Sequence, residues 1–263
     1  MILRGDYSSD VLRTTANIQF MIPDSGEGPF KTAYLLHGLH ANHSAWTNNS
    51  MLSLYGKKYD CIFIMPDAGR SFYFDLKYGR NYFTFVSEEL PQITKNIFNI
   101  SSRREDTAII GYSMGGNGAL KMALSKPERY GFCGAISSAC IYFEKVIDAI
   151  RGDPSGVNYG DAVEAKEILK DLYNFYGANL EYRLDNDIPH LMKNFPAGSP
   201  KPIFHSTCGT EDSLIKENRK LANDMKNASF DFTYEEWEGA HEWDFFNAAL
   251  EKTLEFWYKR NSE

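Results

Sequence analysis

The segment DTAIIGYSMGGNG, residues 106–118, places a serine between glycines at the end of a short apolar run. Such a run is typical of a strand that is buried on both faces. One interpretation is a tight turn of small residues, in which Ser113 caps the next helix. The alternative is the Gly-x-Ser-x-Gly turn called a nucleophile elbow, in which a strained strand-to-helix connection exposes Ser113. Because the pattern alone is weak evidence, residues elsewhere in the chain must decide between the two.

The composition of the 263 residues is that of an ordinary globular protein, with 43% hydrophobic and 24% charged residues and a net charge of −7. The length suits a single α/β domain over residues 1–263. Because the basic residues form no run, we expect no nucleic-acid partner. The start of the chain shows no export signal, and no apolar stretch approaches the roughly 20 residues that cross a bilayer. We therefore expect a cytoplasmic protein without a membrane partner, and the sequence leaves open whether it forms a homo-oligomer.

Seven apolar segments are typical of strands, and amphipathic segments typical of helices lie between and after them. The helical patterns cover about residues 83–98, 116–125 and 242–260, and in the last of these the apolar side chains recur at helical spacing. Strands that alternate with helices predict a mostly parallel sheet with helices on both faces. The strand segments are ANIQFMIP, TAYLLHG, CIFIMPDA, TAIIGYS, GFCGAISSA, PIFHSTCG and FDFTYEEW.

Residues 141–200 interrupt this alternation, because they carry no strong strand pattern and one convincing helix, at roughly residues 161–176. A long insertion in a compact domain is usually functional or disordered. We expect it to form a cap that borders a pocket, and a plain surface elaboration is the alternative. Since no repeat or linker is evident, one domain with a cap insertion at about 141–200 is the simplest description.

The cysteines and a histidine cluster do not follow the spacing of metal sites. His37, His40 and His43 match no recognised zinc motif, and no carboxylate accompanies them on the same short segment, so we expect no metal. The cysteines lie in or beside apolar strand segments, which favours buried, reduced thiols. They are Cys61, Cys133, Cys140 and Cys208.

A nucleophilic serine needs a base within hydrogen-bond reach and usually a carboxylate that orients the base. After an elbow on such a sheet, the expected chain order is serine, then acid, then histidine. Of the histidines that follow Ser113, His190 lies in the insertion and His205 lies inside a strand segment, whereas His241 occupies a loop after the last strand. We therefore predict His241 as the base, and a helix-start residue without chemistry is the alternative.

Two adjacent carboxylates, Glu211 and Asp212, follow the strand segment that ends near Cys208. Catalytic groups gather at the carboxyl ends of strands in open α/β sheets, so both are candidates for the acid. We favour Asp212, because the shorter side chain is the commoner orienter in this arrangement. Glu211 stays open, as does a role of both in capping a helix that begins near Ser213.

Backbone N–H groups must stabilise the negative charge that develops on a carbonyl oxygen under attack. One donor comes from the residue after the nucleophile, and the other comes from the loop after an earlier strand. These positions correspond to Met114 and Leu39. Gly38, which precedes Leu39, would let the backbone approach closely.

Five segments in order, HGLHANHSAW, MPDAGRSFYFD, GYSMGG, GTEDSL and GAHEWDFF, resemble the esterase D / tributyrin esterase branch of the α/β-hydrolases. The similarity runs from about residue 17 to residue 257. It implies the α/β-hydrolase fold, with a catalytic triad of Ser113, Asp212 and His241 and with Leu39 and Met114 as oxyanion donors. It also implies a serine carboxylesterase that needs no cofactor. Its small-molecule substrates would be acetyl or butyryl esters, or acetyl and feruloyl esters from plant cell walls.

The chain departs from this pattern at two places. S-formylglutathione hydrolases continue the first motif with a threonine and a cysteine where this chain has HGLHAN, so a thioesterase of that type is an alternative, as is an acyltransferase on the same fold. A non-catalytic binding module is the alternative from a different class. The branch often has His or Leu before the serine, whereas this chain has Tyr112, whose effect the sequence does not predict.

Aromatic residues are concentrated around residues 72–83, and Trp46 follows the segment that holds the second oxyanion donor. We expect Trp46 and Tyr73 to border the pocket and to contact the substrate. The alternative is that these side chains pack in the core, as aromatic residues usually do.

Overall fold

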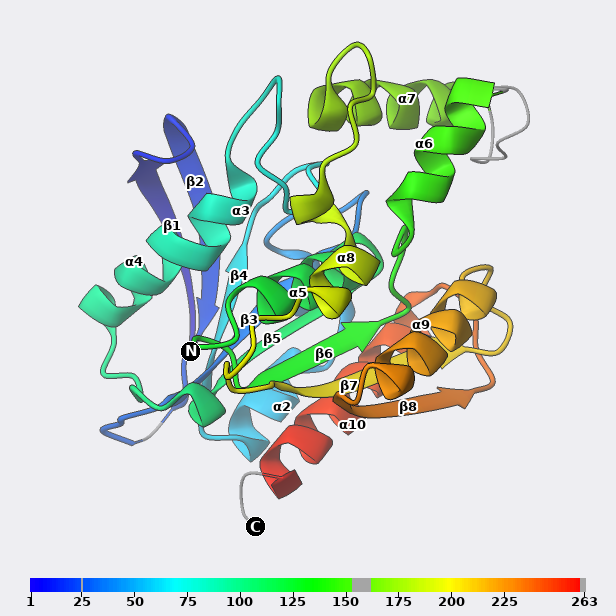
Figure 1. Cartoon of the computed structure of the whole chain (residues 1–263). Coiled ribbons are helices and arrows are strands. Elements are labelled where there is room, and N and C mark those ends of the chain that lie inside the picture. The colour runs from blue at the N-terminus through cyan, green and yellow to red at the C-terminus, as the bar shows by residue number, and fades with distance from the viewer. Residues whose placement is uncertain (25, 153–161, 261–263) are drawn as a thin grey trace.

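The computed structural model describes residues 1–24, 26–152 and 162–260. Its centre is an eight-stranded sheet with the strand order β1-β2-β4-β3-β5-β6-β7-β8 (Figure 1). All seven strand segments predicted from the sequence form strands. The strands are β1 (Ile2–Ser9), β2 (Thr14–Met21), β3 (Lys31–Leu36), β4 (Cys61–Pro66), β5 (Thr107–Tyr112), β6 (Phe132–Ile136), β7 (Ile203–Gly209) and β8 (Asp231–Trp237).

Strand β1 is the one strand of this sheet that the sequence does not predict. It pairs with β2 alone and lies at the edge, and seven of its eight residues are at least partly exposed. A strand of this kind buries little side-chain surface, so its sequence needs no apolar run. By contrast, five of the six residues of β5 are buried, as expected for a central strand covered on both faces.

The strands from β3 to β8 run parallel, and β1 and β2 are antiparallel additions at one edge. Because parallel strands point the same way, the loops that follow β3, β5, β7 and β8 all leave one edge of the sheet. The chain goes from β3 outward to β4 and then returns to place β5 on the other side of β3. In open α/β sheets, ligands bind outside the strand ends at such a reversal of strand order.

Helices cover both faces of the sheet, so that two hydrophobic clusters flank it. Helices α1 (Ala45–Asn49), α2 (Leu52–Lys58) and α10 (Trp243–Arg260) contribute to one cluster. The other cluster includes residues of α4 (Leu90–Ile97), α5 (Met114–Ser125) and α9 (Ile215–Asn227). The predicted helix over residues 83–98 is present but irregular, because α3 (Tyr82–Thr84) and a π-turn at Phe85–Glu89 precede α4. This doubly covered sheet confirms the predicted α/β class.

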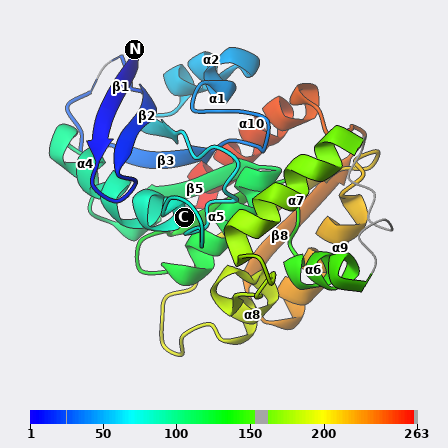
Figure 2. The ribbon, with the colours of Figure 1, turned by 90° about the horizontal axis from the view of Figure 1, so that it is seen from above.

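Residues 141–200 hold more helix than the sequence indicates. Besides α7 (Ala162–Tyr176), which matches the predicted helix, they form α6 (Phe143–Gly152), a 3-10 turn at Leu184–Asn186 and α8 (Ile188–Lys193). Figure 1 shows α6 and α7 standing above the sheet, and Figure 2 shows α7 lying over the region of α5. The predicted helix start at Asp161 and the segment 153–161 lie outside the described residues.

All four cysteines are free thiols: Cys61, Cys133 and Cys208 are buried, and Cys140 is partly exposed. Among the described residues, no helix combines the length and the apolar character that a bilayer crossing requires.

Candidate active site

Ser113 lies in a strained turn between β5 and α5, with φ 54° and ψ −120°. This backbone conformation is costly for a residue with a side chain, and it is typical of functional turns. The glycines on either side of Ser113 are required because there is no room for a side chain at these positions. A Cβ on Gly111 would lie 2.1 Å from the Gly115 carbonyl oxygen, and a Cβ on Gly115 would lie 2.4 Å from the Leu36 carbonyl oxygen. The turn therefore presses against the end of β3 and leaves the Ser113 side chain partly exposed.

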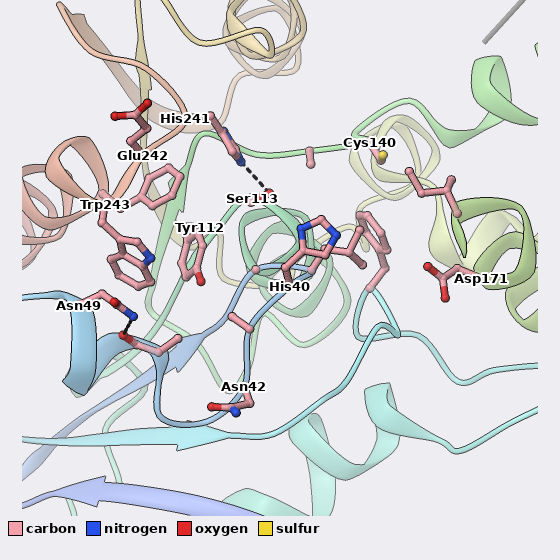
Figure 3. A pocket seen from close by; sticks show the side chains of 18 of the residues that line it. His40, Asn42, Asn49, Tyr112, Ser113, Cys140, Asp171, His241, Glu242 and Trp243 are labelled. Atoms are coloured by element: carbon pink, nitrogen blue, oxygen red, sulfur yellow. Dashed lines mark hydrogen bonds between the residues drawn. The ribbon is translucent and has the colours of Figure 1, made fainter. Parts of the chain in front are cut away.

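Three residues from separate parts of the chain meet at this turn through side-chain hydrogen bonds. Nε2 of His241, in the loop before α10, lies 3.0 Å from Ser113 Oγ. Nδ1 of the same ring lies 2.8 Å from Asp212 Oδ2, in the loop after β7. The distances match the serine, base and acid that the sequence analysis selected. Figure 3 shows the His241 ring directed at Ser113.

The other candidates for the acid and the base have different environments. Glu211 is exposed, whereas only 2% of Asp212 is exposed. His205 is buried within β7 and hydrogen-bonds to Thr253 Oγ1 at 3.0 Å. His190 lies in α8, where its ring contacts the Asn194 amide at 3.2 Å.

The Asp212 carboxylate stays ionised in spite of its burial. Burial alone would raise its pKa, but hydrogen bonds from His241 and from the backbone N–H of Leu214 outweigh that effect and lower the pKa. Oδ1 accepts the Leu214 N–H at 2.8 Å, which leaves Oδ2 for the imidazole. A buried anion fixed in this way can hold His241 in one orientation and stabilise its protonated form.

Of the two residues predicted to supply oxyanion donors, Met114 follows Ser113 in the chain and Leu39 lines the same cavity as Ser113. Met114 is the first residue of α5, and Leu39 follows the end of β3. In the parts of the chain that the structure describes, neither N–H donates a hydrogen bond to another protein group. Both are therefore available to an incoming oxygen atom.

A cavity of about 640 Å³ opens around Ser113 and His241. Figure 3 shows Asn49 and Trp243 on one side of Ser113, and Cys140 and Asp171 on the other. The lining also includes the polar residues Asn42, Ser44 and Asn48. The second side is a mostly apolar chamber, which we name the acyl chamber, and its lining also includes Asp171, which forms an ion pair with Arg70. Its walls are Phe72, Phe143, Val146, Ile168, Leu172 and Phe175.

The acyl chamber depends on residues that the sequence analysis did not single out. Phe143 and Val146 come from α6, and Ile168, Leu172 and Phe175 come from α7. The spacing of the three α7 residues places them on one face of that helix, which is a signal that could have identified them.

The expectation that Trp46 and Tyr73 contact the substrate is wrong. Neither side chain is among those that line the cavity, and their exposed fractions are 1% and 0%. Trp46 packs edge-on against Tyr112 and Trp243, with ring centroids 5.1 and 5.5 Å away. The aromatic residue that does reach the cavity from residues 69–83 is Phe72, because successive side chains of that turn point in different directions.

Tyr112, the unusual residue before the serine, lies between the two loops that meet at the site. Its ring lies so close to Gly38 that a Cβ there would be 2.6 Å from Tyr112 Cε2. On its other side it contacts Phe246, whose ring in turn lies 5.0 Å from that of His241. Tyr112 thus connects the oxyanion loop, residues 37–41, with the helix that follows the imidazole.

The histidines considered as metal ligands have other environments. His37 Nε2 and His43 Nδ1 lie 3.6 and 3.5 Å from the carboxylate of Asp67. His40 lines the cavity. Within residues 1–24, 26–152 and 162–260, no three histidine, cysteine or carboxylate side chains are grouped to hold a metal ion.

Comparisons with known proteins identify the family of the chain. Residues 9–257 match the model of the Esterase family, described as "Putative esterase". An acetyl esterase from Caldicellulosiruptor saccharolyticus is 31% identical over 271 residues, which covers 98% of each chain. The match to the family model extends over nearly the whole sheet and its helices.

Solved structures with the same fold are more distant in sequence. The fluorophosphonate-binding serine hydrolase F of Staphylococcus aureus superposes with a TM-score of 0.83 at 21% identity and covers 98% of each chain. A ferulic acid esterase gives a TM-score of 0.76 at 20% identity, over 98% of this chain and 96% of the other. At such identities the likeness concerns the fold, and it confirms the predicted α/β-hydrolase architecture.

Proposed function

The chain belongs to the Esterase family and is a serine carboxylic ester hydrolase, and from this premise we propose that it cleaves small-molecule esters through an acyl-enzyme on Ser113. The observation that carries this proposal is the hydrogen-bonded series from Ser113 Oγ to His241 and on to Asp212. In this series the proposed nucleophile Ser113 contacts its base, His241, and the base contacts the carboxylate that orients it, Asp212.

The proposed reaction has two halves. Ser113 Oγ attacks the ester carbonyl carbon while its proton passes to His241 Nε2, and the carbonyl electron pair moves onto the oxygen, which the N–H groups of Leu39 and Met114 bind. When the tetrahedral intermediate collapses, the bond to the alcohol oxygen breaks and His241 returns the proton to the alcohol. Water then attacks the acyl-enzyme by the same route, which releases the acid and free Ser113.

The position of His241 assigns the two sides of the cavity to the two parts of the ester. The alcohol oxygen must receive a proton from Nε2, so the alcohol lies on the side of His241 and Trp243. The acyl group then points the opposite way, past Cys140 and into the acyl chamber (Figure 3).

We infer from this placement that the preferred acyl groups are apolar and larger than acetyl. An acetyl group places a single methyl at the entrance of the chamber, whereas a chain of several carbons or an aromatic ring would bury its surface against the six apolar walls. The polar side chains of Asn42, Asn48 and Ser44 suit an alcohol that carries hydroxyl groups. Aromatic esters, which the ferulic acid esterase named above cleaves, fall within this class, whereas acetyl esters would be accepted without filling the chamber.

The test is hydrolysis of p-nitrophenyl acetate by the native chain and by Ser113→Ala. The proposal predicts a loss of at least about a thousandfold in kcat for the variant, since removal of a triad serine has effects of this order or larger. Ser125→Ala is the matched control, because Ser125 ends the same helix α5 and is not among the residues that line the cavity. Comparable rates for Ser113→Ala and the native chain would refute the assignment.

A thioesterase or acyltransferase activity on the same residues is the second candidate. A thioesterase would release a thiol from an S-formyl thioester. An acyltransferase would form a new ester when an alcohol is added to the reaction. The cytoplasmic location, a homo-oligomeric state and the division into one domain with a cap at about 141–200 remain predictions.

A further inference from the structure

Three consecutive carbonyl groups at the end of β3 each accept a hydrogen bond from a side chain. The Leu36 carbonyl accepts from Trp46 Nε1 at 3.2 Å, the His37 carbonyl accepts from Tyr73 Oη at 3.0 Å, and the Gly38 carbonyl accepts from His37 Nδ1 at 2.8 Å. This stretch leads directly into Leu39, whose N–H is one of the proposed oxyanion donors. All three side chains are at most 1% exposed, so none of them can touch a substrate.

The His37 ring fixes the peptide group that carries the Leu39 N–H. Its Nε2 accepts the backbone N–H of Ala68 at 3.0 Å, so the ring proton must reside on Nδ1, from where it is donated to the Gly38 carbonyl. In a trans peptide, the C=O and the following N–H point in opposite directions. Once the Gly38 carbonyl is fixed toward His37, the Leu39 N–H is directed away from it.

Tyr73 fixes the preceding peptide group, and the backbone is strained where it does so. Phe72 and Tyr73 have φ values of 50° and 57°, a conformation that costs about 1–3 kcal/mol for each such residue. As a result, Phe72 enters the acyl chamber while Tyr73 lies beneath the oxyanion loop. The ring packs closely against α5, where a Cβ on Gly118 would lie 2.5 Å from Tyr73 Cδ2. Burial raises the pKa of Tyr73 well above its ordinary value, so that the hydroxyl remains a donor.

We propose that Tyr73, together with His37 and Trp46, positions the oxyanion loop, so that the Leu39 N–H is held toward the carbonyl oxygen before the substrate arrives. This inference rests on the proposed function. Apolar side chains of the same size would fill the space but would not fix the direction of these carbonyl groups. Instead, the chain places polar hydrogens against three successive carbonyls, and it tolerates two strained residues beside one of them.

Tyr73→Phe tests this positioning role, because it removes one hydroxyl and keeps the ring. We expect kcat for p-nitrophenyl acetate to fall about tenfold, with KM within about twofold. Complete loss of an oxyanion donor costs 10²–10³ in kcat, and a donor that is only misaligned should cost less. The affinity for an alkylboronic acid, which forms a tetrahedral adduct with the serine, should weaken by a similar factor. Active-site titration with a fluorophosphonate counts the folded enzyme in each preparation.

The matched control is Tyr130→Phe, at a tyrosine that is equally buried and whose hydroxyl has no hydrogen-bond partner among the described residues. It should leave kcat and boronate affinity unchanged. If Tyr73→Phe does not fold, Trp46→Phe removes the donor to the Leu36 carbonyl and should show the same parallel loss.

The result that overturns the inference is a variant with native kcat and boronate affinity, or with lowered kcat and native boronate affinity. Native activity of Ser113→Ala would instead refute the proposed function itself, so that the two failures can be told apart.

Discussion

Narrowing the acyl chamber should change which esters the enzyme prefers. Ile168 lies on the cavity face of α7, and Ile168→Phe places a larger side chain in the space proposed for the acyl group. Its neighbour Leu169 is also partly buried but is not among the residues that line the cavity. Leu169→Phe therefore adds the same ring to the same helix outside the chamber and serves as the control.

The size of the effect follows from apolar burial. Each buried methylene contributes about 0.8 kcal/mol, or roughly fourfold in kcat/KM. A hexanoyl group has four more carbons than an acetyl group, so complete burial would favour hexanoate by up to about 3 kcal/mol, or roughly 200-fold. If the new phenyl ring excludes about two methylenes, the ratio of hexanoate to acetate kcat/KM should fall by about 15-fold.

The assay is the rate of p-nitrophenol release from acetate, butyrate and hexanoate esters by the native chain and the two variants. Because the alcohol is the same throughout, changes in the ratio report the acyl side alone. We expect the ratio to fall for Ile168→Phe and to stay at the native value for Leu169→Phe. A native ratio in Ile168→Phe, or an equal fall in both variants, would refute the placement of the acyl group.

The remaining predictions concern the triad, the elbow and a buried amine. Asp212→Asn should lower kcat by roughly 10³–10⁴ while KM changes little, because a neutral amide cannot stabilise the protonated imidazole or hold its tautomer; steady-state kinetics checks this. Gly115→Ala should lower the urea midpoint of unfolding and abolish activity, since its Cβ would lie 2.4 Å from the Leu36 carbonyl oxygen; native activity would contradict the packing described. Burial lowers the pKa of Lys121 to about 7, in spite of the nearby Asp185 and Asp75 carboxylates. An unfolded lysine stays protonated up to about pH 10.4, so between pH 7 and 10 the unfolded state binds more protons than the folded state. The contribution of Lys121 to the free energy of unfolding therefore rises with pH over this window. Lys121→Met should therefore gain stability relative to the native chain at pH 7, and the gain should shrink at pH 9.5; a difference independent of pH in urea denaturation would count against a buried amine of lowered pKa.

The sequence predicted the sheet because central strands must be apolar on both faces, which leaves a clear pattern in the chain. Edge strand β1 carries no such pattern and was not predicted. The contact between the residues predicted as nucleophile, acid and base could be predicted for a similar reason. Each follows a strong strand segment, and parallel strands bring their carboxyl ends to one edge, so order along the chain was enough to predict that Ser113, Asp212 and His241 meet.

The walls of the cavity were harder to predict, because they depend on the direction of each side chain. Trp46 and Tyr73 are near the site in space, yet they lie behind the surface that a substrate would touch. Phe72 and Tyr73 both have positive φ values, and as a result one ring lines the cavity whereas the other packs beneath residues 37–41. Amino-acid composition does not reveal such backbone angles. The contribution of α6 was missed, because its short amphipathic pattern lies in a segment without flanking strands.

The origin of the acyl chamber has a consequence for how such an enzyme diversifies. Five of its six walls belong to one continuous excursion of the chain, while the reactive groups stand on loops anchored in the sheet. If this chamber binds the acyl group as proposed, we expect mutations in α6 and α7 to change the accepted ester without changing the reaction. We also expect that exchange of residues 141–200 between relatives would change ester selectivity while Ser113, Asp212 and His241 stay in place.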